Sequence, residues 1–203
     1  ALAPVAHLHW PYLAAVGVAA ALLVYEHAIV SPTDLSRVNV AFFGEGAMAE
    51  GAFHESMNLA ALWRLPVAFF CENNLYAMGT ALERSESQTD LCAKAAAFRV
   101  PTLEADGMDA IAVHEAATKA VAHVRGGDGP FFVEFRTYRY RAHSMFDPDL
   151  YRDKAEVEAW KHRGPIHNLS DRLKAEGRLT EEQFLAIDAE AQREVEEAVA
   201  FAE

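Results

Sequence analysis

The sequence predicts a doubly wound α/β fold with a mostly parallel sheet, followed by a C-terminal helical extension. Four short apolar runs typical of buried strands alternate with longer segments of helical periodicity. Such alternation indicates parallel strands joined by helices. Beyond residue 151 the chain becomes charged and helical, with no further strand pattern. We therefore expect an α/β domain over residues 1–150 and a helical extension over residues 151–203.

The expected strands are residues 38–43, 67–71, 100–104 and 131–136. Apolar side chains spaced for one buried face predict a helix over residues 50–63. Thr89 and Asp90 offer an N-cap for a helix that ends near residue 98. A further helix over residues 109–124 ends at a glycine-rich breaker. The segment around Gly79 is expected to be a loop.

Residues 139–151 lack periodicity and mix charged residues with Ser and Pro, which is typical of a functional loop. Three helices are expected after it, over residues 154–163, 165–176 and 180–203. The last of them carries an apolar seam formed by Phe184, Ile187, Val195 and Val199. This seam could cover the chain's own domain or a partner.

Residues 11–25 are expected to form a buried core helix ahead of the first strand. The apolar stretch around them could be mistaken for a membrane span, but it contains Pro11, Gly17, Glu26 and His27. It is also at the short end for crossing a bilayer. No charged leader or cleavage pattern precedes it, so we expect no signal peptide.

The composition narrows the classes of partner. The chain has 203 residues and a net charge of −12, which argues against binding nucleic acid or an anionic membrane surface. Its two cysteines, Cys71 and Cys92, fit a reducing cytoplasm better than a disulfide scaffold. We therefore expect neither a nucleic-acid nor a membrane partner.

A glycine-flanked acid and an amide pair follow the first two expected strands. Glu45 comes directly after the first strand, and Asn73 and Asn74 follow the second. Ligands of open α/β sheets gather at the carboxyl ends of parallel strands. Hard oxygen ligands beside glycine amides and a helix N-terminus suit Mg²⁺ and a diphosphate. The expected metal ligands are Glu45, Asn74 and the carbonyl of Tyr76, and the expected diphosphate-lining residues are Gly44, Gly46 and Ala47.

Other interpretations of these residues stay open. By itself, the acid between two glycines is equally compatible with an ordinary strand-to-helix turn. His143 could belong to a surface salt network, because charged residues surround it. His54 and Glu55 suggest a zinc helix, but no second histidine has the required spacing. A nucleotide-binding enzyme is disfavoured because the chain lacks a G-x-G-x-x-G fingerprint and a P-loop lysine.

Several motifs extend this pattern. They are GEGA at 44–47, EGAFHE at 50–55, NLAALW at 58–63, CENN at 71–74, YAMGT at 76–80 and TYRYRAHSM at 137–145. Together they resemble thiamine-diphosphate enzymes and, more narrowly, the alpha subunit of the decarboxylating component of 2-oxo acid dehydrogenase complexes. The pyruvate type is the nearest likeness. The resemblance runs from about residue 38 to the C-terminus and implies a thiamine-diphosphate-binding fold.

The resemblance implies oxidative decarboxylation of a 2-oxo acid, with transfer of the acyl group to lipoamide. It implies thiamine diphosphate and Mg²⁺ as cofactors, and Glu45, Asn74 and the Tyr76 carbonyl as metal ligands. It also implies a beta subunit in an α₂β₂ assembly and a lipoyl-bearing acyltransferase core as partners. The glutamate that activates the cofactor would belong to the beta subunit. The compartment would be a bacterial-like cytoplasm, with a mitochondrial matrix as the alternative.

The resemblance also assigns roles within the loop of residues 139–151. His143 would be the catalytic residue of this chain, which hydrogen-bonds the diphosphate and helps acyl transfer. Arg141 and Ser144 would contact the cofactor beside it. Phe146 stands where animal relatives carry a regulatory serine, so that switch is not expected here.

Two departures from the family pattern support a different hypothesis. The family carries an aspartate where Glu45 stands, and the extra methylene displaces the carboxylate by about 1–1.5 Å. The N-terminal part also looks shortened relative to the family, because an aromatic-arginine pair that helps to grip the diphosphate has no counterpart. The alternative is a non-catalytic or truncated assembly subunit that pairs with a beta chain but binds cofactor weakly.

Overall fold

The computed structural model describes residues 38–202, so the helix expected over residues 11–25 lies outside the described residues. The chain divides into two compact units. One contains the sheet and ends at Tyr151, and the other takes residues 108–110 and resumes at Arg152. None of the helices within residues 38–202 is long and apolar enough to cross a membrane.

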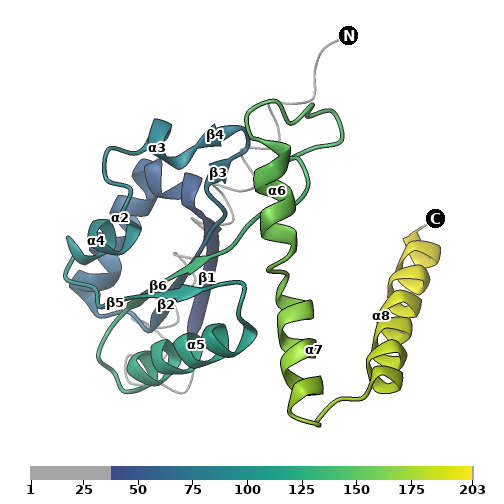
Figure 1. Cartoon of the computed structure of the whole chain (residues 1–203). Coiled ribbons are helices and arrows are strands. Elements are labelled where there is room, and N and C mark those ends of the chain that lie inside the picture. Colours follow the sequence, from purple (N-terminus) through teal and green to yellow (C-terminus); the bar gives the residue numbers. More distant parts are fainter. Residues whose placement is uncertain (1–37, 203) are drawn as a thin grey trace. The chain divides into compact units, whose positions relative to one another are not determined.

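A four-stranded parallel sheet forms the centre of the first unit (Figure 1). Its strands lie in the order β1 (Asn39–Gly44), β2 (Val67–Asn73), β6 (Phe131–Arg136) and β5 (Thr102–Asp106). All three neighbouring pairs are parallel. The expected α/β fold with a mostly parallel sheet is therefore confirmed.

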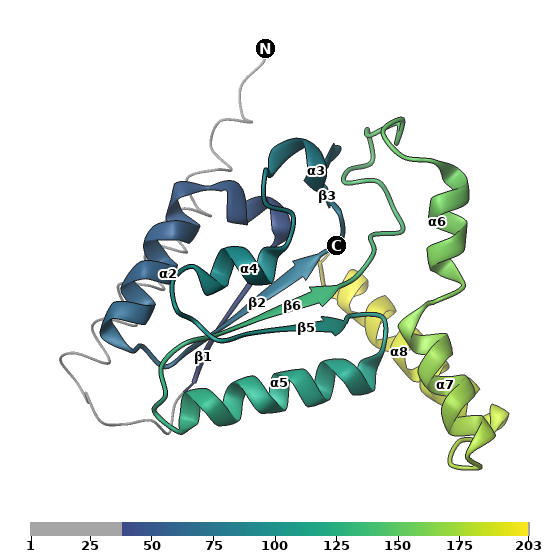
Figure 2. The same cartoon turned by 60° about the vertical axis from the view of Figure 1, so that its left-hand side comes forward.

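Helices cover both faces of the sheet (Figure 2). Helices α2 (Gly51–Trp63) and α4 (Leu91–Ala96) lie on one face, and α5 (Ala110–Arg125) lies on the other. The chain moves from β1 through β2 to β5 in one direction and then returns to β6. Because crossovers between parallel strands are right-handed, reversing the direction moves the helix to the opposite face.

Strand β2 is buried on both faces, which explains its nearly continuous apolar sequence. Phe69 and Cys71 pack in the cluster beneath α2 and α4, whereas Ala68 and Phe70 pack in the cluster beneath α5. Cys71 is fully buried. Because successive side chains of a strand point to opposite faces, this alternation fixes the face to which each residue of β2 points, up to Asn73 at its end.

Short elements near the carboxyl ends of the strands differ from the sequence prediction. A 3₁₀ turn, η3 (Glu45–Ala49), precedes α2. The segment expected to be a loop around Gly79 contains a hairpin, β3 (Tyr76–Ala77) with β4 (Thr80–Ala81), followed by α3 (Leu82–Ser85). Two non-glycine residues, Leu75 and Met78, adopt positive φ angles of 73° and 56° there. Sequence gives little warning of such residues, because L-amino acids rarely adopt this conformation.

The second unit contains α6 (Lys154–Lys161), α7 (Pro165–Ala175) and α8 (Glu181–Ala202), so the three helices predicted after the loop are present. Asp153 caps α6 by accepting from the Ala155 amide. Gly177, with φ of 69°, lies between α7 and α8. Lys174 of α7 pairs with Glu181 at 2.6 Å. Helix α8 has no buried side chain among the described residues; Ile187, Val195 and Val199 of its apolar seam are exposed, and Phe184 is half-buried.

Candidate metal centre

Glu45 is a buried carboxylate at the carboxyl end of β1. It begins η3 directly after the strand, and its side chain is only 1% exposed. Its Oε2 accepts from the Asn74 backbone amide at 3.0 Å and lies 3.4 Å from Asn74 Nδ2. Because β1 and β2 are neighbouring parallel strands, their ends bring these two residues together. The sequence predicted this meeting.

The burial of Glu45 leaves its carboxylate poorly solvated. Burial raises the pKa of the Glu45 carboxyl, although the Asn74 amide and the charge of Arg139 act in the opposite direction. Removal from water is what disfavours the charged form of a carboxyl group. A cation bound beside the group would restore that stabilisation.

Asn74 provides a second oxygen at the same place. Its Oδ1 is buried and has no hydrogen-bond partner among the described residues. If the carboxamide turned over, Oδ1 would face Glu45 in place of Nδ2, and both side chains would offer oxygen. Such a turn would give up the contact between Nδ2 and Glu45 and bring two acceptor oxygens together, which a bound cation would make favourable. An unpartnered buried oxygen on the side chain that contacts a desolvated carboxylate fits a hard divalent cation.

The remaining candidate ligand, the Tyr76 carbonyl, belongs to the first residue of β3. Tyr76 lies two residues beyond Asn74, and its ring packs 5.6 Å from the ring of Tyr151. Its part in metal binding stays a prediction. Residues 38–202 hold no group of three His, Cys, Asp or Glu side chains that could bind a metal, so the zinc interpretation of His54 gains no support.

The glycine after Glu45 is required by close packing. A Cβ at Gly46 would lie 2.5 Å from the Ala77 Cβ, so only glycine lets η3 approach β3 this closely. At Gly44 the nearest neighbour would be 3.9 Å away, so packing does not demand glycine there. Ala47 is exposed. Gly44, Gly46 and Ala47, which are expected to line a diphosphate, lie directly before and after Glu45 in the chain.

Lys94 supports the same turn from α4. Its Nζ donates to the Met48 carbonyl at 2.6 Å and to Glu86 Oε1 at 2.6 Å. The Lys94 and Glu86 side chains are 12% and 9% exposed. This largely buried ion pair therefore fixes the end of η3 to the helix beside it.

The loop of residues 139–151 is anchored by Tyr151. The Tyr151 hydroxyl donates to Asp147 Oδ2 at 2.9 Å and accepts from Arg139 at 2.8 Å. Arg139 also donates to the Met78 carbonyl at 2.6 Å. The loop is thereby tied to the β3–β4 hairpin, which follows Asn74 in the chain.

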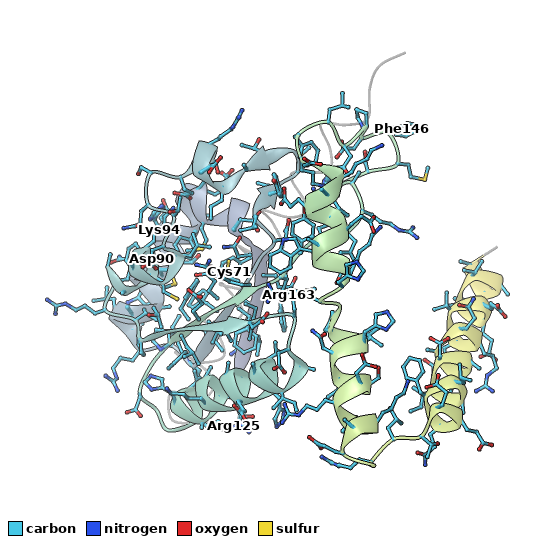
Figure 3. All side chains as sticks on the ribbon, in the orientation of Figure 1. Cys71, Asp90, Lys94, Arg125, Phe146 and Arg163 are labelled. Carbon is cyan, nitrogen blue, oxygen red and sulfur yellow. The ribbon has the colours of Figure 1, made fainter. Side chains whose placement is uncertain are left out.

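His143, Arg141 and Ser144 lie in this loop with exposed side chains. Their recorded bonds involve backbone atoms: the His143 amide donates to Asp147, and the Arg141 and Ser144 carbonyls accept from Arg139 and Asp147. The structure records no hydrogen bond from these side chains to Glu45 or Asn74. Beside them, Phe146 is 90% exposed and projects from the loop (Figure 3).

Sequence reasoning missed Glu134, Lys94 and the anchoring role of Tyr151. Glu134 is fully buried in β6 and accepts from Asn73 Nδ2 at 2.8 Å. A signal for it exists, because it is the single acid within an otherwise apolar strand run. No comparable sequence signal marks Lys94, since its contact with Met48 spans 46 residues.

A cavity of about 340 Å³ lies beside the turn that follows β2. It is lined by Asn73, Leu75, Tyr76, Ala81, Leu82, Glu83, Thr89 and Arg136. The cavity therefore opens at the carboxyl ends of β2 and β6, where ligands of doubly wound sheets bind. This fold and site define an α/β protein with a candidate oxygen-ligand cation site at the strand ends.

Comparisons with known proteins identify the family. A family model described as "Dehydrogenase E1 component" matches residues 7–203. The chain is 46% identical over 167 residues to "Pyruvate dehydrogenase E1 component subunit alpha" of Rhizobium meliloti (strain 1021), covering 82% of this chain and 48% of that protein. It is 45% identical over 166 residues to the protein of the same name from Zymomonas mobilis, covering 81% and 47%.

A mammalian relative is similar over the same extent. The chain is 43% identical over 168 residues to "Pyruvate dehydrogenase E1 component subunit alpha, testis-specific form, mitochondrial" of Rattus norvegicus, covering 82% of this chain and 42% of that protein. The chain thus spans about half the length of these curated relatives. The protein belongs to the dehydrogenase E1 component family.

Proposed function

We propose that this chain is the metal- and cofactor-binding part of the alpha subunit of a 2-oxo acid dehydrogenase, with pyruvate as substrate. The single observation that carries the proposal is the contact between Glu45 and Asn74, whose Oδ1 is left without a partner among the described residues. The names of the relatives support pyruvate as the substrate.

The donor set fits Mg²⁺ bound to a diphosphate. Glu45, Asn74 and the Tyr76 carbonyl would supply three oxygens, and diphosphate oxygens and water would complete the coordination. Gly44, Gly46 and Ala47 would let the backbone approach the diphosphate. Thiamine diphosphate, when bound, supplies the carbanion chemistry that decarboxylates a 2-oxo acid, while the protein positions it.

The anchored loop would complete the site. Arg141, His143 and Ser144 would reach the diphosphate from the loop that Tyr151 and Arg139 hold to the hairpin. Cationic and hydroxyl groups are suitable donors to phosphate oxygens. His143 would in addition assist acyl transfer to lipoamide as a hydrogen-bond donor.

The proposed assembly is α₂β₂, with a separate lipoyl-bearing acyltransferase core that accepts the acyl group. In this assembly the beta subunit supplies the glutamate that activates the cofactor. The exposed seam of α8, which includes Ile187 and Val195, is a surface available for assembly. The residues of this chain then act as anchors for the cofactor, and none of them need be its activating base.

The test is co-expression with the beta subunit, followed by decarboxylation assays across several 2-oxo acids. We expect pyruvate to be preferred and activity to require Mg²⁺ and thiamine diphosphate. Glu45→Gln removes the charge at nearly constant shape and should abolish Mg²⁺ dependence together with activity. Glu50→Gln changes an exposed acid at the end of the same turn and should leave activity intact. Equal activity in both variants would refute the metal site.

A second candidate function is a non-catalytic assembly subunit. The glutamate at position 45 favours it, because the family carries the shorter aspartate. Thermal melts with Mg²⁺ and thiamine diphosphate separate the two, since a ligand at a hundred times its dissociation constant stabilises by about 2.7 kcal/mol. An unchanged melting temperature in the assembled protein would favour the non-catalytic subunit.

A further inference from the structure

Glu134 places a carboxylate in the interior of the sheet. It is 0% exposed, and its neighbours along β6 are apolar. Phe132 packs beneath α2 and α4, whereas Val133 and Phe135 pack beneath α5. Burying a carboxylate carries a large free-energy cost, and a well-packed apolar side chain often does as well or better. Packing alone therefore does not explain an acid at this position.

Asn73 is the hydrogen-bond partner of Glu134. Glu134 Oε1 accepts from Asn73 Nδ2 at 2.8 Å and lies 3.3 Å from Arg136 Nε. Its Oε2 has no hydrogen-bond partner among the described residues. Arg136 is half-exposed and also pairs with Glu104 at 3.1 Å, so it does not depend on Glu134 for a partner.

The Asn73 side chain connects Glu134 to the turn after β2. Asn73 is 1% exposed, and its Oδ1 accepts from the Leu75 amide at 3.0 Å. A carboxylate can only accept and a backbone amide can only donate, so the Asn73 carboxamide cannot turn over without losing both bonds. Its backbone carbonyl also accepts from the Thr137 amide at 2.9 Å. Glu134 thus fixes the direction in which Asn73 Oδ1 points.

The bond to Leu75 holds a backbone conformation that leucine rarely adopts. Leu75 has φ of 73°, in the left-handed region. It lies between Asn74 and Tyr76, the two proposed ligands contributed by this turn. The conformation of Leu75 therefore sets where both of them present their oxygens.

We propose that Glu134 and Asn73 form a positioning pair that fixes the turn of residues 74–76 for cation binding. This inference rests on the proposed function, because it concerns the same metal site. Neither residue touches the cation. Each acts through Leu75 on the ligands that flank it.

The experiment uses the full chain assembled with its beta subunit and measures Mn²⁺ binding by electron paramagnetic resonance with thiamine diphosphate present. Glu134→Met removes the acceptor at similar volume and leaves Asn73 Nδ2 unpaired. We expect the dissociation constant for Mn²⁺ to rise about tenfold, which corresponds to about 1.4 kcal/mol. Leaving the buried Asn73 Nδ2 without an acceptor should lower the metal-free melting temperature, and the loss of the buried acid offsets part of that cost. A merely structural role would lower the melting temperature but leave the dissociation constant for Mn²⁺ of the folded protein unchanged.

Three further variants provide a matched control and a rescue. Glu134→Gln keeps an oxygen that can accept from Asn73 and should retain most of the Mn²⁺ affinity. Asn73→Asp brings two carboxylates together and should weaken binding. In the variant that combines Asn73→Asp with Glu134→Gln, the amide at position 134 donates to the carboxylate at position 73. This restores a hydrogen bond of reversed direction and should recover the affinity for Mn²⁺. Asn73→Asp and the combined variant also test the pair if Glu134→Met does not fold.

Wild-type Mn²⁺ affinity in Glu134→Met, or no recovery in the combined variant, would overturn the positioning role while leaving the proposed function intact. Failure of the wild-type assembly to bind Mn²⁺ would overturn the metal site and, with it, this inference. Glu45→Gln serves as the control that should abolish binding. The two kinds of failure are therefore distinguishable.

Discussion

Lys94 donates to the carbonyl oxygen of Met48 at 2.6 Å and thereby holds the turn that begins with Glu45 against α4. Figure 3 shows Lys94 on that helix. The ammonium group is paired with Glu86 in surroundings that exclude most water. Removing one member of a largely buried pair leaves the other charge without compensation, which is strongly destabilising.

We expect Lys94→Met to lower the free energy of unfolding by about 3 kcal/mol. Urea unfolding of the full chain measures this loss. The matched control is Lys161→Met, which removes a pair of similar length, Lys161 to Glu158 at 2.7 Å, whose side chains are 48% and 62% exposed. Exposed pairs contribute about 0–1 kcal/mol, so the control should change little. Equal effects of the two substitutions would contradict the structural role of Lys94.

Gly46→Ala should loosen the packing of η3 on β3. The added Cβ would meet the Ala77 Cβ at 2.5 Å, and such overpacking costs about 1–3 kcal/mol. We expect weaker stabilisation by Mg²⁺ and thiamine diphosphate in thermal melts.

Two controls accompany this substitution. Ala77→Gly, added to Gly46→Ala, should restore part of the lost stabilisation because it removes the opposing atom. Gly51→Ala places a Cβ in open space at the start of α2 and should be neutral or slightly stabilising. If Gly51→Ala weakened cofactor binding as much as Gly46→Ala, close approach of the two backbones would not be the cause.

Stability should depend on pH through Glu45. Because burial raises its pKa above the ordinary value of 4.5, the folded metal-free chain binds more protons than the unfolded chain between the two pKa values. This contribution to stability is therefore present at low pH and is lost as pH rises through that window. The slope from one group is at most about 1.4 kcal/mol per pH unit.

Urea unfolding in a pH series that starts near 4.5 tests this expectation. Glu45→Gln should remove the part of the pH dependence of the unfolding free energy that comes from Glu45, whereas Glu50→Gln should leave that part unchanged. With Mg²⁺ and cofactor in excess, the ionised carboxylate is the binding form, so ligand-induced stabilisation should grow as pH rises. A wild-type slope that survived Glu45→Gln would assign the effect to another group, such as Glu134, whose pKa burial also raises.

Tyr151→Phe should release the loop of residues 139–151. The substitution removes the hydroxyl that joins Arg139 to Asp147, while its ring can still pack near Tyr76. We expect faster hydrogen exchange at the His143 and Asp149 amides, which donate to Asp147. Leu150→Ala alters an exposed side chain of the same loop and should leave exchange there unchanged. Unchanged exchange after Tyr151→Phe would show that the loop is held elsewhere.

The sequence predicted the strands and long helices because each carries a local signal, a short apolar run for a strand and helical periodicity for a helix. Boundaries shifted where a partner strand decides them. Residues 100–104 were expected to be a strand, but β5 covers Thr102–Asp106, paired in register with β6 from Phe132. Pro101 instead accepts from the Phe132 amide through its carbonyl. A proline has no amide to donate, so it is suited to a position just before the paired segment.

The candidate site was predictable only in part. Glu45 and Asn74 could be paired because parallel strands end at the same edge. The turn between Asn74 and Tyr76 was not foreseeable, since Leu75 takes a left-handed conformation without glycine. Glu134 is recognisable afterwards as an acid within an apolar strand, but its bond to Asn73 depends on the strand order.

The placement of Cys71 in the centre of the sheet has a consequence for thiol chemistry. Burial raises the pKa of the Cys71 thiol far above its usual range and that of Cys92 to about 11. Since the thiolate is the reactive form, alkylating agents and peroxide should attack the folded chain slowly. Reagents could then modify Cys71 only when the sheet opens. The rate at which Cys71 is labelled would therefore report the rate or free energy of that opening.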